Sequence, residues 1–184
     1  MISGSGMIVK IDESKFGKRK NNQGHLVEGV WVVGGCEKDG RGIFAVPVQN
    51  RSAQTLLQII NRYVRPGSII YTDCWRGYRT NDLAALGFHH NTVNHTFNFV
   101  DPVTGVHTNT IEGTWSAMKS SIAVRHRTTQ YIGNELLVFI WKRKHEANLW
   151  ERFLHVIGNI EYEEIDHEAP LPPDIVAELN AVHI

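Results

Sequence analysis

The chain has 184 residues, of which 42% are hydrophobic and 21% charged, so it is long enough for one domain with a sizeable core. Its 19 Lys and Arg residues balance 19 Asp and Glu residues, which excludes a basic arm or an acidic solvating chain as the dominant character. No apolar run reaches the roughly 18 residues that a membrane span needs, so we expect no membrane partner. Two cysteines exclude a disulfide scaffold.

The balanced charge hides an asymmetry along the chain. Residues 161–184 contain seven acidic residues and no Lys or Arg, so residues 1–160 carry a net charge of +7. A basic body suits a polyanionic partner, although many soluble domains carry a similar charge. We therefore expect a folded domain over residues 1–158 and an acidic C-terminal tail over residues 159–184.

The first fifty residues predict three strands. Residues 7–12 form a short β-type run that ends at Asp12. Residues 28–36 and 42–48 are two further strands, because a Lys38-Asp39-Gly40 turn signal separates two Val-containing runs. The basic residues that follow Asp12 are interleaved with Gly and Asn and are predicted to form a turn: Lys15, Lys18, Arg19 and Lys20.

The rest of the chain alternates between helices and strands. Ser52 is the predicted N-cap of a helix with one apolar face. A short apolar strand at residues 68–72 leads to Asp73, and residues 88–95 form another strand. Further helices are expected at residues 80–86, 109–120 and 130–145. This order of elements indicates an α/β fold.

Acidic residues occur at two predicted strand ends and in one predicted helix. Asp12 and Asp73 each close a strand, and Glu112 lies in the helix at residues 109–120. Strand ends from distant parts of the sequence build the active sites of open α/β sheets. Converging carboxylates repel one another, and a hard divalent cation such as Mg²⁺ relieves that repulsion. A metal site is one interpretation; loop caps and a solvated helix position are the other.

Three segments, in order, resemble one family. Residues 11–16 (IDESKF), 71–78 (YTDCWRGY) and 107–115 (HTNTIEGTW) resemble the catalytic domain of Merlin-type DNA transposases and related insertion-sequence transposases, the ISXO2-like transposase domain. Residues 99–105 (FVDPVTG) resemble the Merlin branch in particular. Asp73 lies 61 positions after Asp12, and Glu112 follows 39 positions later, which matches the family's order and spacing. The resemblance extends from about residue 8 to about residue 150.

The resemblance implies a ribonuclease-H-like fold, in which a mixed five-stranded sheet with three antiparallel first strands is flanked by helices. It also implies a DDE site, in which Asp12, Asp73 and Glu112 are both catalytic and metal-binding and hold two Mg²⁺ or Mn²⁺ ions. Asn109, one helical turn before Glu112, is the alternative third ligand, because some related proteins use Asn there. The implied enzyme is a DNA nuclease and phosphoryl transferase that cuts transposon ends and joins them to target DNA.

The resemblance names DNA as the partner and a homodimer as a common assembly. Lys119, seven positions after Glu112, would contact a phosphate near the scissile bond. The basic run Lys15, Lys18, Arg19 and Lys20 would hold the duplex backbone, although a solvated turn fits it equally. Trp75, Tyr78 and Trp115 are predicted to be core aromatics, with base stacking as the alternative for Trp75 and Tyr78.

One departure from the family keeps a second hypothesis open. Family members usually carry an N-terminal zinc-ribbon or helix-turn-helix region that recognises transposon ends, and no such segment precedes residue 8 here. We therefore expect a fragment, or a repurposed copy that acts as an inactive, transposase-derived DNA-binding or interaction module. The Merlin-like segment favours a nuclear location in a eukaryotic host, whereas a bacterial host implies the cytoplasm or nucleoid.

Overall fold

A computed structural model describes residues 1–17, 29–38, 42–93 and 107–160. The chain divides into two compact units, residues 1–147 and residues 148–184, and each is described by itself. Among the described residues, every helix is too short or too polar to cross a membrane.

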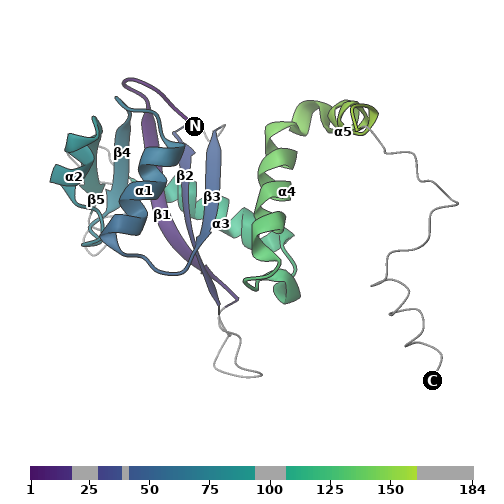
Figure 1. The fold of residues 1–184 in the computed structure, drawn as a ribbon, viewed down its shortest axis with the longest axis horizontal. Coiled ribbons are helices and arrows are strands. Elements are labelled where there is room, and N and C mark those ends of the chain that lie inside the picture. Colours follow the sequence, from purple (N-terminus) through teal and green to yellow (C-terminus); the bar gives the residue numbers. More distant parts are fainter. Residues whose placement is uncertain (18–28, 39–41, 94–106, 161–184) are drawn as a thin grey trace, which may run out of the picture. The chain divides into compact units, whose positions relative to one another are not determined.

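The first unit is built on a five-stranded mixed sheet (Figure 1). Its strands are β1 (Ile8–Phe16), β2 (Val30–Glu37), β3 (Ile43–Val48), β4 (Ile69–Asp73) and β5 (His89–Val93). Their order in the sheet is β3-β2-β1-β4-β5. The pairs β1–β2 and β2–β3 are antiparallel, while β1–β4 and β4–β5 are parallel. The predicted mixed sheet with three antiparallel first strands is therefore confirmed.

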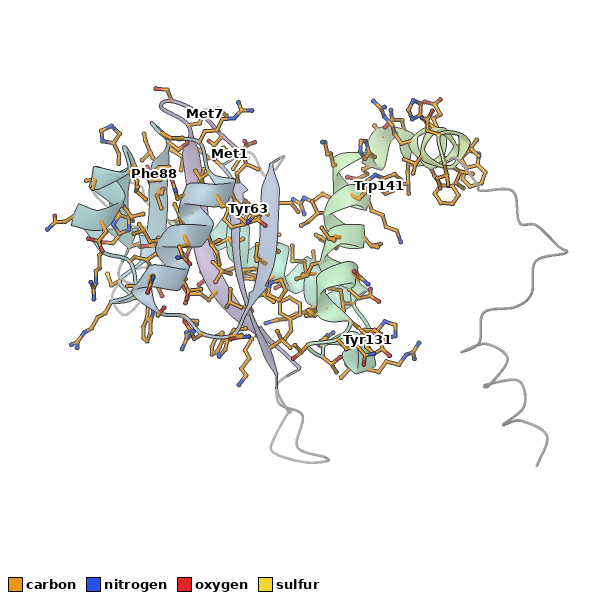
Figure 2. All side chains as sticks on the ribbon, viewed as in Figure 1. Met1, Met7, Tyr63, Phe88, Tyr131 and Trp141 are labelled. Carbon is orange, nitrogen blue, oxygen red and sulfur yellow. The ribbon has the colours of Figure 1, made fainter. Side chains whose placement is uncertain are left out.

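One face of the sheet is covered by α1 (Ala53–Tyr63) and α2 (Thr80–Ala85) (Figure 1). Ser52 caps α1 as predicted, because its side chain accepts a hydrogen bond from the Thr55 amide. The apolar positions of α1 pack on the odd-numbered residues of β1, and Tyr63 stacks on Phe44 with ring centroids 5.2 Å apart (Figure 2). The buried core on this face includes Val9, Ile11, Leu56, Ile60, Ile70 and Leu83.

The opposite face is covered by α3 (Asn109–Ser121) and by α4 (Ile132–Lys144), which packs against β3. A 3₁₀ turn, η1 (Val124–His126), lies between these two helices, and Tyr131 immediately precedes α4 (Figure 2). A second buried core holds the helices to the sheet through Phe16, Val32, Ile111, Trp115, Met118 and Leu136. The two cores together sandwich the sheet, so β1 at its centre is buried on both faces.

The described part of the second unit is one helix, α5 (Leu149–Gly158), which the sequence reasoning did not predict. A 3₁₀ turn, η2 (Glu146–Asn148), precedes it. The large apolar side chains of α5 are exposed to solvent, and 68% of the surface of Trp150 is exposed. The acidic residues 161–184 lie outside the described residues.

The first strand is longer than predicted, and Asp12 does not close it. β1 continues to Phe16 because residues 13–16 pair with β2, from Glu13↔Val33 to Phe16↔Val30. Lys15 therefore belongs to β1 and faces Trp31 across the ladder rather than lying in a turn. A polar run that resembles a turn in sequence is held in a strand by its neighbour in the sheet.

Candidate active site

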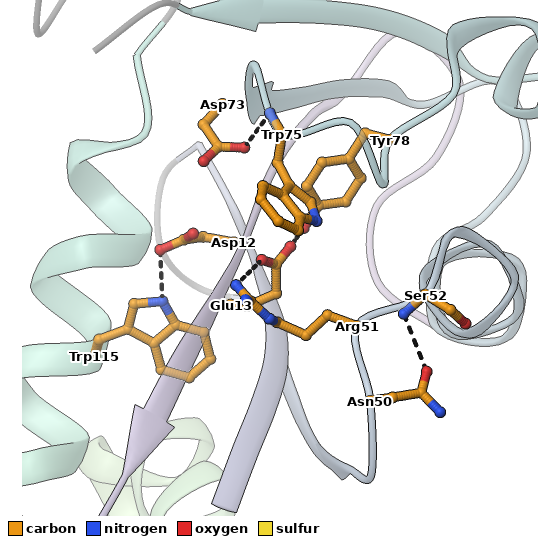
Figure 3. Close-up of polar contacts among 9 residues, drawn as sticks. All are labelled: Asp12, Glu13, Asn50, Arg51, Ser52, Asp73, Trp75, Tyr78 and Trp115. Atoms are coloured by element: carbon orange, nitrogen blue, oxygen red, sulfur yellow. Dashed lines mark hydrogen bonds and ion pairs between the residues drawn. The ribbon is translucent and has the colours of Figure 1, made fainter. Parts of the chain in front are cut away.

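Two neighbouring parallel strands bring Asp12 and Asp73 together. The register of β1 and β4 pairs Ile8 with Ile69 and Lys10 with Tyr71, so two residues further along Asp12 is level with Asp73. β4 ends at Asp73, whereas β1 continues, which opens the sheet at this point. Figure 3 shows the two carboxylates pointing toward the same space beside α3.

Asp12 is oriented by a tryptophan of α3. Trp115 Nε1 donates a hydrogen bond to Asp12 Oδ2 over 3.0 Å (Figure 3). Gly34, which pairs with Asp12 across β1 and β2, leaves room for the indole, because a Cβ there would overlap Trp115 Cη2. Burial raises the pKa of the Asp12 carboxyl, hydrogen bonds from the Glu13 backbone and Trp115 lower it, and the neighbouring Asp73 and Glu112 charges raise it.

Glu112, the third predicted ligand, lies in the first turn of α3. Its Oε1 accepts a hydrogen bond from Thr108 Oγ1 over 2.9 Å, and its side chain is exposed. The negative charges of Glu112 and Asp73 both raise the pKa of Asp12. Asn109, the alternative third ligand, is the exposed first residue of the same helix.

The trio has the donor chemistry that a hard divalent cation requires, because all three side chains offer carboxylate oxygens. Their mutual repulsion at Asp12 is the electrostatic cost that such a cation offsets. The carboxylates are nevertheless not closed around one point: within residues 1–17, 29–38, 42–93 and 107–160, no three His, Cys, Asp or Glu side chains form a group able to hold an ion.

Comparison with known families matches most of the first unit. Residues 3–142 match the model of a family described as the ISXO2-like transposase domain. The chain belongs to this transposase family. The predicted family is thereby confirmed, and the three acidic residues all lie within the matched region.

Two further relatives of this transposase domain are informative. An uncharacterized transposase-like protein of Haemophilus influenzae is 39% identical over 59 residues, which cover 32% of this chain and 46% of that protein's length. The chain thus matches about half the length of this curated relative. The simian T-cell lymphotropic virus intasome, solved with a PP2A regulatory subunit, matches with a TM-score of 0.52 at 17% identity, over 92% of this chain and 57% of that one. The fold of the transposase domain is ribonuclease-H-like, as predicted.

The predicted DNA-contacting lysine of α3 lies beside Asp12. Lys119 Nζ donates a hydrogen bond to Ser14 Oγ over 2.6 Å and lies 5.3 Å from the centroid of the Phe16 ring. Burial lowers the pKa of Lys119, Arg127 lowers it further, and Asp12 raises it. Lys119 therefore reaches β1 two residues after the first carboxylate of the trio.

The predicted basic run is described only in part. Lys15 is half-buried, and its Nζ lies 5.6 Å from the centroid of the Trp31 ring. Lys18, Arg19 and Lys20 lie outside the described residues, so their predicted contact with the duplex backbone stays a prediction.

A buried lysine that the sequence reasoning did not single out joins β1 to α3. Lys10 is 1% exposed, and its Nζ lies 2.7 Å from Thr110 Oγ1 and 3.1 Å from His107 Nε2. Burial lowers the pKa of Lys10. Lys10 is two residues before Asp12 on the same face of β1, so it fixes the start of α3 close to the carboxylates.

A second polar network lies on the other face of β1. Glu13, with only 5% of its side chain exposed, accepts a hydrogen bond from the Tyr78 hydroxyl and pairs with Arg51 Nη1 over 3.5 Å (Figure 3). Burial raises the pKa of Glu13, the Tyr78 hydrogen bond lowers it, and Asp12 and Asp73 raise it. Sequence reasoning missed Glu13 and Arg51, because their spacing in the sequence carries no signal that would pair them.

The three aromatic predictions had different outcomes. Tyr78 and Trp115 are buried core residues, as predicted, with 7% and 5% of their surface exposed. Trp75, which was also predicted to be core, is 43% exposed, so that prediction is wrong. The turn after β4 explains the difference, because the Trp75 amide donates to Asp73 Oδ1 over 2.9 Å and holds the residue outside the sheet.

Proposed function

We propose that this chain is the catalytic core of a DDE transposase that cuts and joins DNA strands in a reaction that depends on divalent metal ions. The observation that carries the proposal is the register of β1 and β4, which sets Asp12 level with Asp73, while the charge of Glu112 on α3 acts on Asp12. Membership of a transposase family supports DNA as the substrate and the transposon end and target as its two forms.

The three carboxylates are the residues that would hold Mg²⁺ or Mn²⁺, with two ions expected. Ions at such a site lower the pKa of the attacking hydroxyl group and offset the charge that develops on the leaving oxygen. The chain's own residues orient the reactants. Trp115 fixes the Asp12 carboxylate by donating its Nε1 hydrogen to Asp12 Oδ2.

The proposed reaction has two steps, and each replaces one oxygen at a phosphorus atom with another. In cleavage, a water oxygen bonds to the phosphorus at the transposon end, and the 3′-oxygen leaves and takes up a proton. In strand transfer, that 3′-hydroxyl group loses its proton as its oxygen bonds to a target phosphorus, and the target's own 3′-oxygen leaves and takes up a proton. Lys119, anchored on Ser14, and Lys15 supply positive charge for the phosphates on either side.

A plasmid-nicking assay tests the proposal. Supercoiled plasmid is incubated with the full chain and Mg²⁺ or Mn²⁺, beside Asp73→Asn and the matched control Asp82→Asn, whose carboxylate is on α2. We expect nicking that falls about a hundredfold or more in Asp73→Asn, because losing a metal ligand removes several kcal/mol of transition-state stabilisation. Asp82→Asn should nick as the natural chain does. Equal nicking by both variants, or none by the natural chain, contradicts the proposal.

A second candidate is a DNA-binding module without catalysis. It is favoured by the open arrangement of the acidic residues, since the described part of the chain holds no closed group of three metal-ligating side chains. Calorimetric titration with Mn²⁺ distinguishes the two candidates. Binding that disappears in Asp12→Asn supports the enzyme, whereas DNA binding without specific Mn²⁺ binding supports the module.

A further inference from the structure

Aromatic rings and cations alternate in a row that ends at the candidate active site. Arg51 Cζ lies 3.7 Å from the centroid of the Trp31 ring and 4.8 Å from that of Trp75. Lys15 Nζ approaches Trp31 as well, at 5.6 Å. The row therefore runs from β1 and β2 to the turn that follows Asp73, and its last member is the exposed indole of Trp75.

The buried side chain of Glu13 holds this row in place through Arg51. Arg51 is fixed by its ion pair with Glu13, which in turn accepts the Tyr78 hydroxyl hydrogen bond. Figure 3 shows the Trp75 indole lying over Arg51 and Glu13, with its backbone joined to Asp73. A guanidinium stacked between two indoles is a favourable cation–π arrangement, so the Trp75 ring is oriented before any ligand arrives.

The turn leaves space for this indole because position 77 is glycine. A Cβ at Gly77 would lie 2.7 Å from Trp75 Nε1 and 2.8 Å from Trp75 Cδ1. The ring thus packs on the backbone of its own turn and still presents 43% of the residue's surface outward. Arg76, the next residue in the chain, is exposed, and the exposed Arg79 pairs with Asp82 over 4.0 Å.

We infer that Trp75, supported by Arg51, is a stacking platform for the base of an unpaired nucleotide next to the phosphodiester that Asp12 and Asp73 receive. This inference rests on the proposed function, because it takes DNA as the substrate. An exposed aromatic ring next to a cation is an arrangement with which proteins bind single strands, since every base has a face to stack and every nucleotide a phosphate to neutralise.

The position of the platform selects an unpaired strand over a duplex. In a duplex, each base is covered on both faces by its neighbours, and only an end or an extruded base offers a free face. The Trp75 amide is bonded directly to the Asp73 carboxylate, so a base on this indole belongs to a nucleotide beside the reacting phosphate. The platform would therefore hold a strand end that cleavage has frayed or released.

Fluorescence anisotropy with two labelled probes tests the platform. The probes are a twelve-nucleotide oligothymidylate and a blunt twelve-base-pair duplex, titrated with the full chain in the absence of Mg²⁺ and Mn²⁺. We expect Trp75→Ala to weaken oligothymidylate binding about tenfold, the size of one lost base stack, and to change duplex binding less than about twofold. Trp75→Phe keeps a ring and should retain most of the affinity.

Matched controls keep the result interpretable. Trp150→Ala removes another exposed indole, on α5, and should leave both affinities unchanged. Trp75→Leu keeps an apolar side chain without an aromatic face, so it should behave as Trp75→Ala does. Unchanged oligothymidylate affinity in Trp75→Ala and Trp75→Leu, or an equal loss for both probes, overturns the inference.

The stacking platform and the proposed catalysis can each be contradicted without the other. A natural chain that never nicks plasmid but loses single-strand affinity in Trp75→Ala contradicts the catalytic proposal and supports the platform. A chain that nicks plasmid while Trp75→Ala binds oligothymidylate normally contradicts the platform alone.

Discussion

The two faces of β1 differ in chemistry although both are buried. The odd-numbered residues Val9 and Ile11 are apolar, fully buried, and packed in the core that α1 and α2 cover. The even-numbered residues Lys10, Asp12 and Ser14 are polar, and each meets a polar atom of α3. Up to Asp12, the strand thus contributes apolar burial on one side and directional contacts on the other, and Glu13 then adds a polar contact to the first side.

The polar face sets the register of α3 on the sheet. Four steps along the strand span about 13 Å, and nine steps along the helix span about 13.5 Å, so contacts at both ends and in the middle fit without strain. Apolar packing tolerates small shifts, whereas a buried hydrogen bond lost by a shift costs about 1–3 kcal/mol. Glu112 lies on α3 between the first two of these contacts. The contacts pair Lys10 with Thr110, Asp12 with Trp115, and Ser14 with Lys119.

Trp115 gives the strongest test of the difference between the two faces of β1, because it belongs to the buried core and also makes a polar contact with Asp12. Trp115→Ala should lower the free energy of unfolding by about 3–5 kcal/mol, because it removes a buried ring and the Asp12 hydrogen bond. Ile60→Val, on the other face, should cost only about 0.5–1.5 kcal/mol. Urea unfolding measures both, and a Trp115→Ala cost no larger than that of Ile60→Val would remove Trp115 from this role.

The Lys10–Thr110 contact tests whether the polar pairs act together. Thr110→Val should cost about 1–3 kcal/mol of unfolding free energy, since it removes an acceptor from a buried ammonium group. Adding Lys10→Met to that variant should recover much of the loss, because no buried polar group is then left without its partner. Thr114→Val, whose hydroxyl donates to the Thr110 carbonyl, is the control. Additive losses in the double variant would contradict the coupling.

The pH dependence of the protein's stability tests the polar face of β1 at Asp12. Burial, together with the Asp73 and Glu112 charges, raises its folded-state pKa above the unfolded value. The associated stability is therefore present below the unfolded pKa and is lost as pH rises through the folded pKa. Without divalent metal, Asp12→Asn should melt about 2–4 °C higher than the natural chain near neutral pH. The gain should disappear in acid; a gain independent of pH would contradict this cause.

The smallest expected effect is a difference in thiol reactivity between the two cysteines. Cys36 is buried on the face that α3 covers, and burial raises its thiol pKa to about 11, whereas Cys74 is exposed beside Asp73. At pH 8 only about a thousandth of the Cys36 thiol is ionised, so iodoacetamide should modify Cys74 and leave Cys36 intact. Peptide mass spectrometry reports each site. Equal modification of the folded chain would mean that the α3 face opens readily.

Much of the fold could be predicted because its signals are local. The Ser52 cap, the strand at residues 69–73 and the helix that contains Glu112 follow from periodicity and capping. The extension of β1 to Phe16 could not, because residues 13–15 are polar and become a strand only by pairing with β2. Helix α5 was missed although its sequence is amphipathic.

The candidate site was predictable only where its residues form motifs. Asp12, Asp73 and Glu112 were identified from three ordered segments, and the family match covers all three. Lys10 was not, because a lysine is ordinarily exposed and its partner Thr110 lies 100 positions away. The exposure of Trp75 depends on the turn at Gly77 and on Arg51, which no spacing in the sequence connects.

The most direct test of the central claim is the position of Mn²⁺ in crystals of the full chain, located by its anomalous scattering. The account predicts an ion bound by oxygens of Asp12 and Asp73, with Glu112 turned toward it and the Trp115–Asp12 hydrogen bond kept. Crystals saturated with Mn²⁺ that show no ion at Asp12 and Asp73, or one there from which Glu112 points away, would contradict the account.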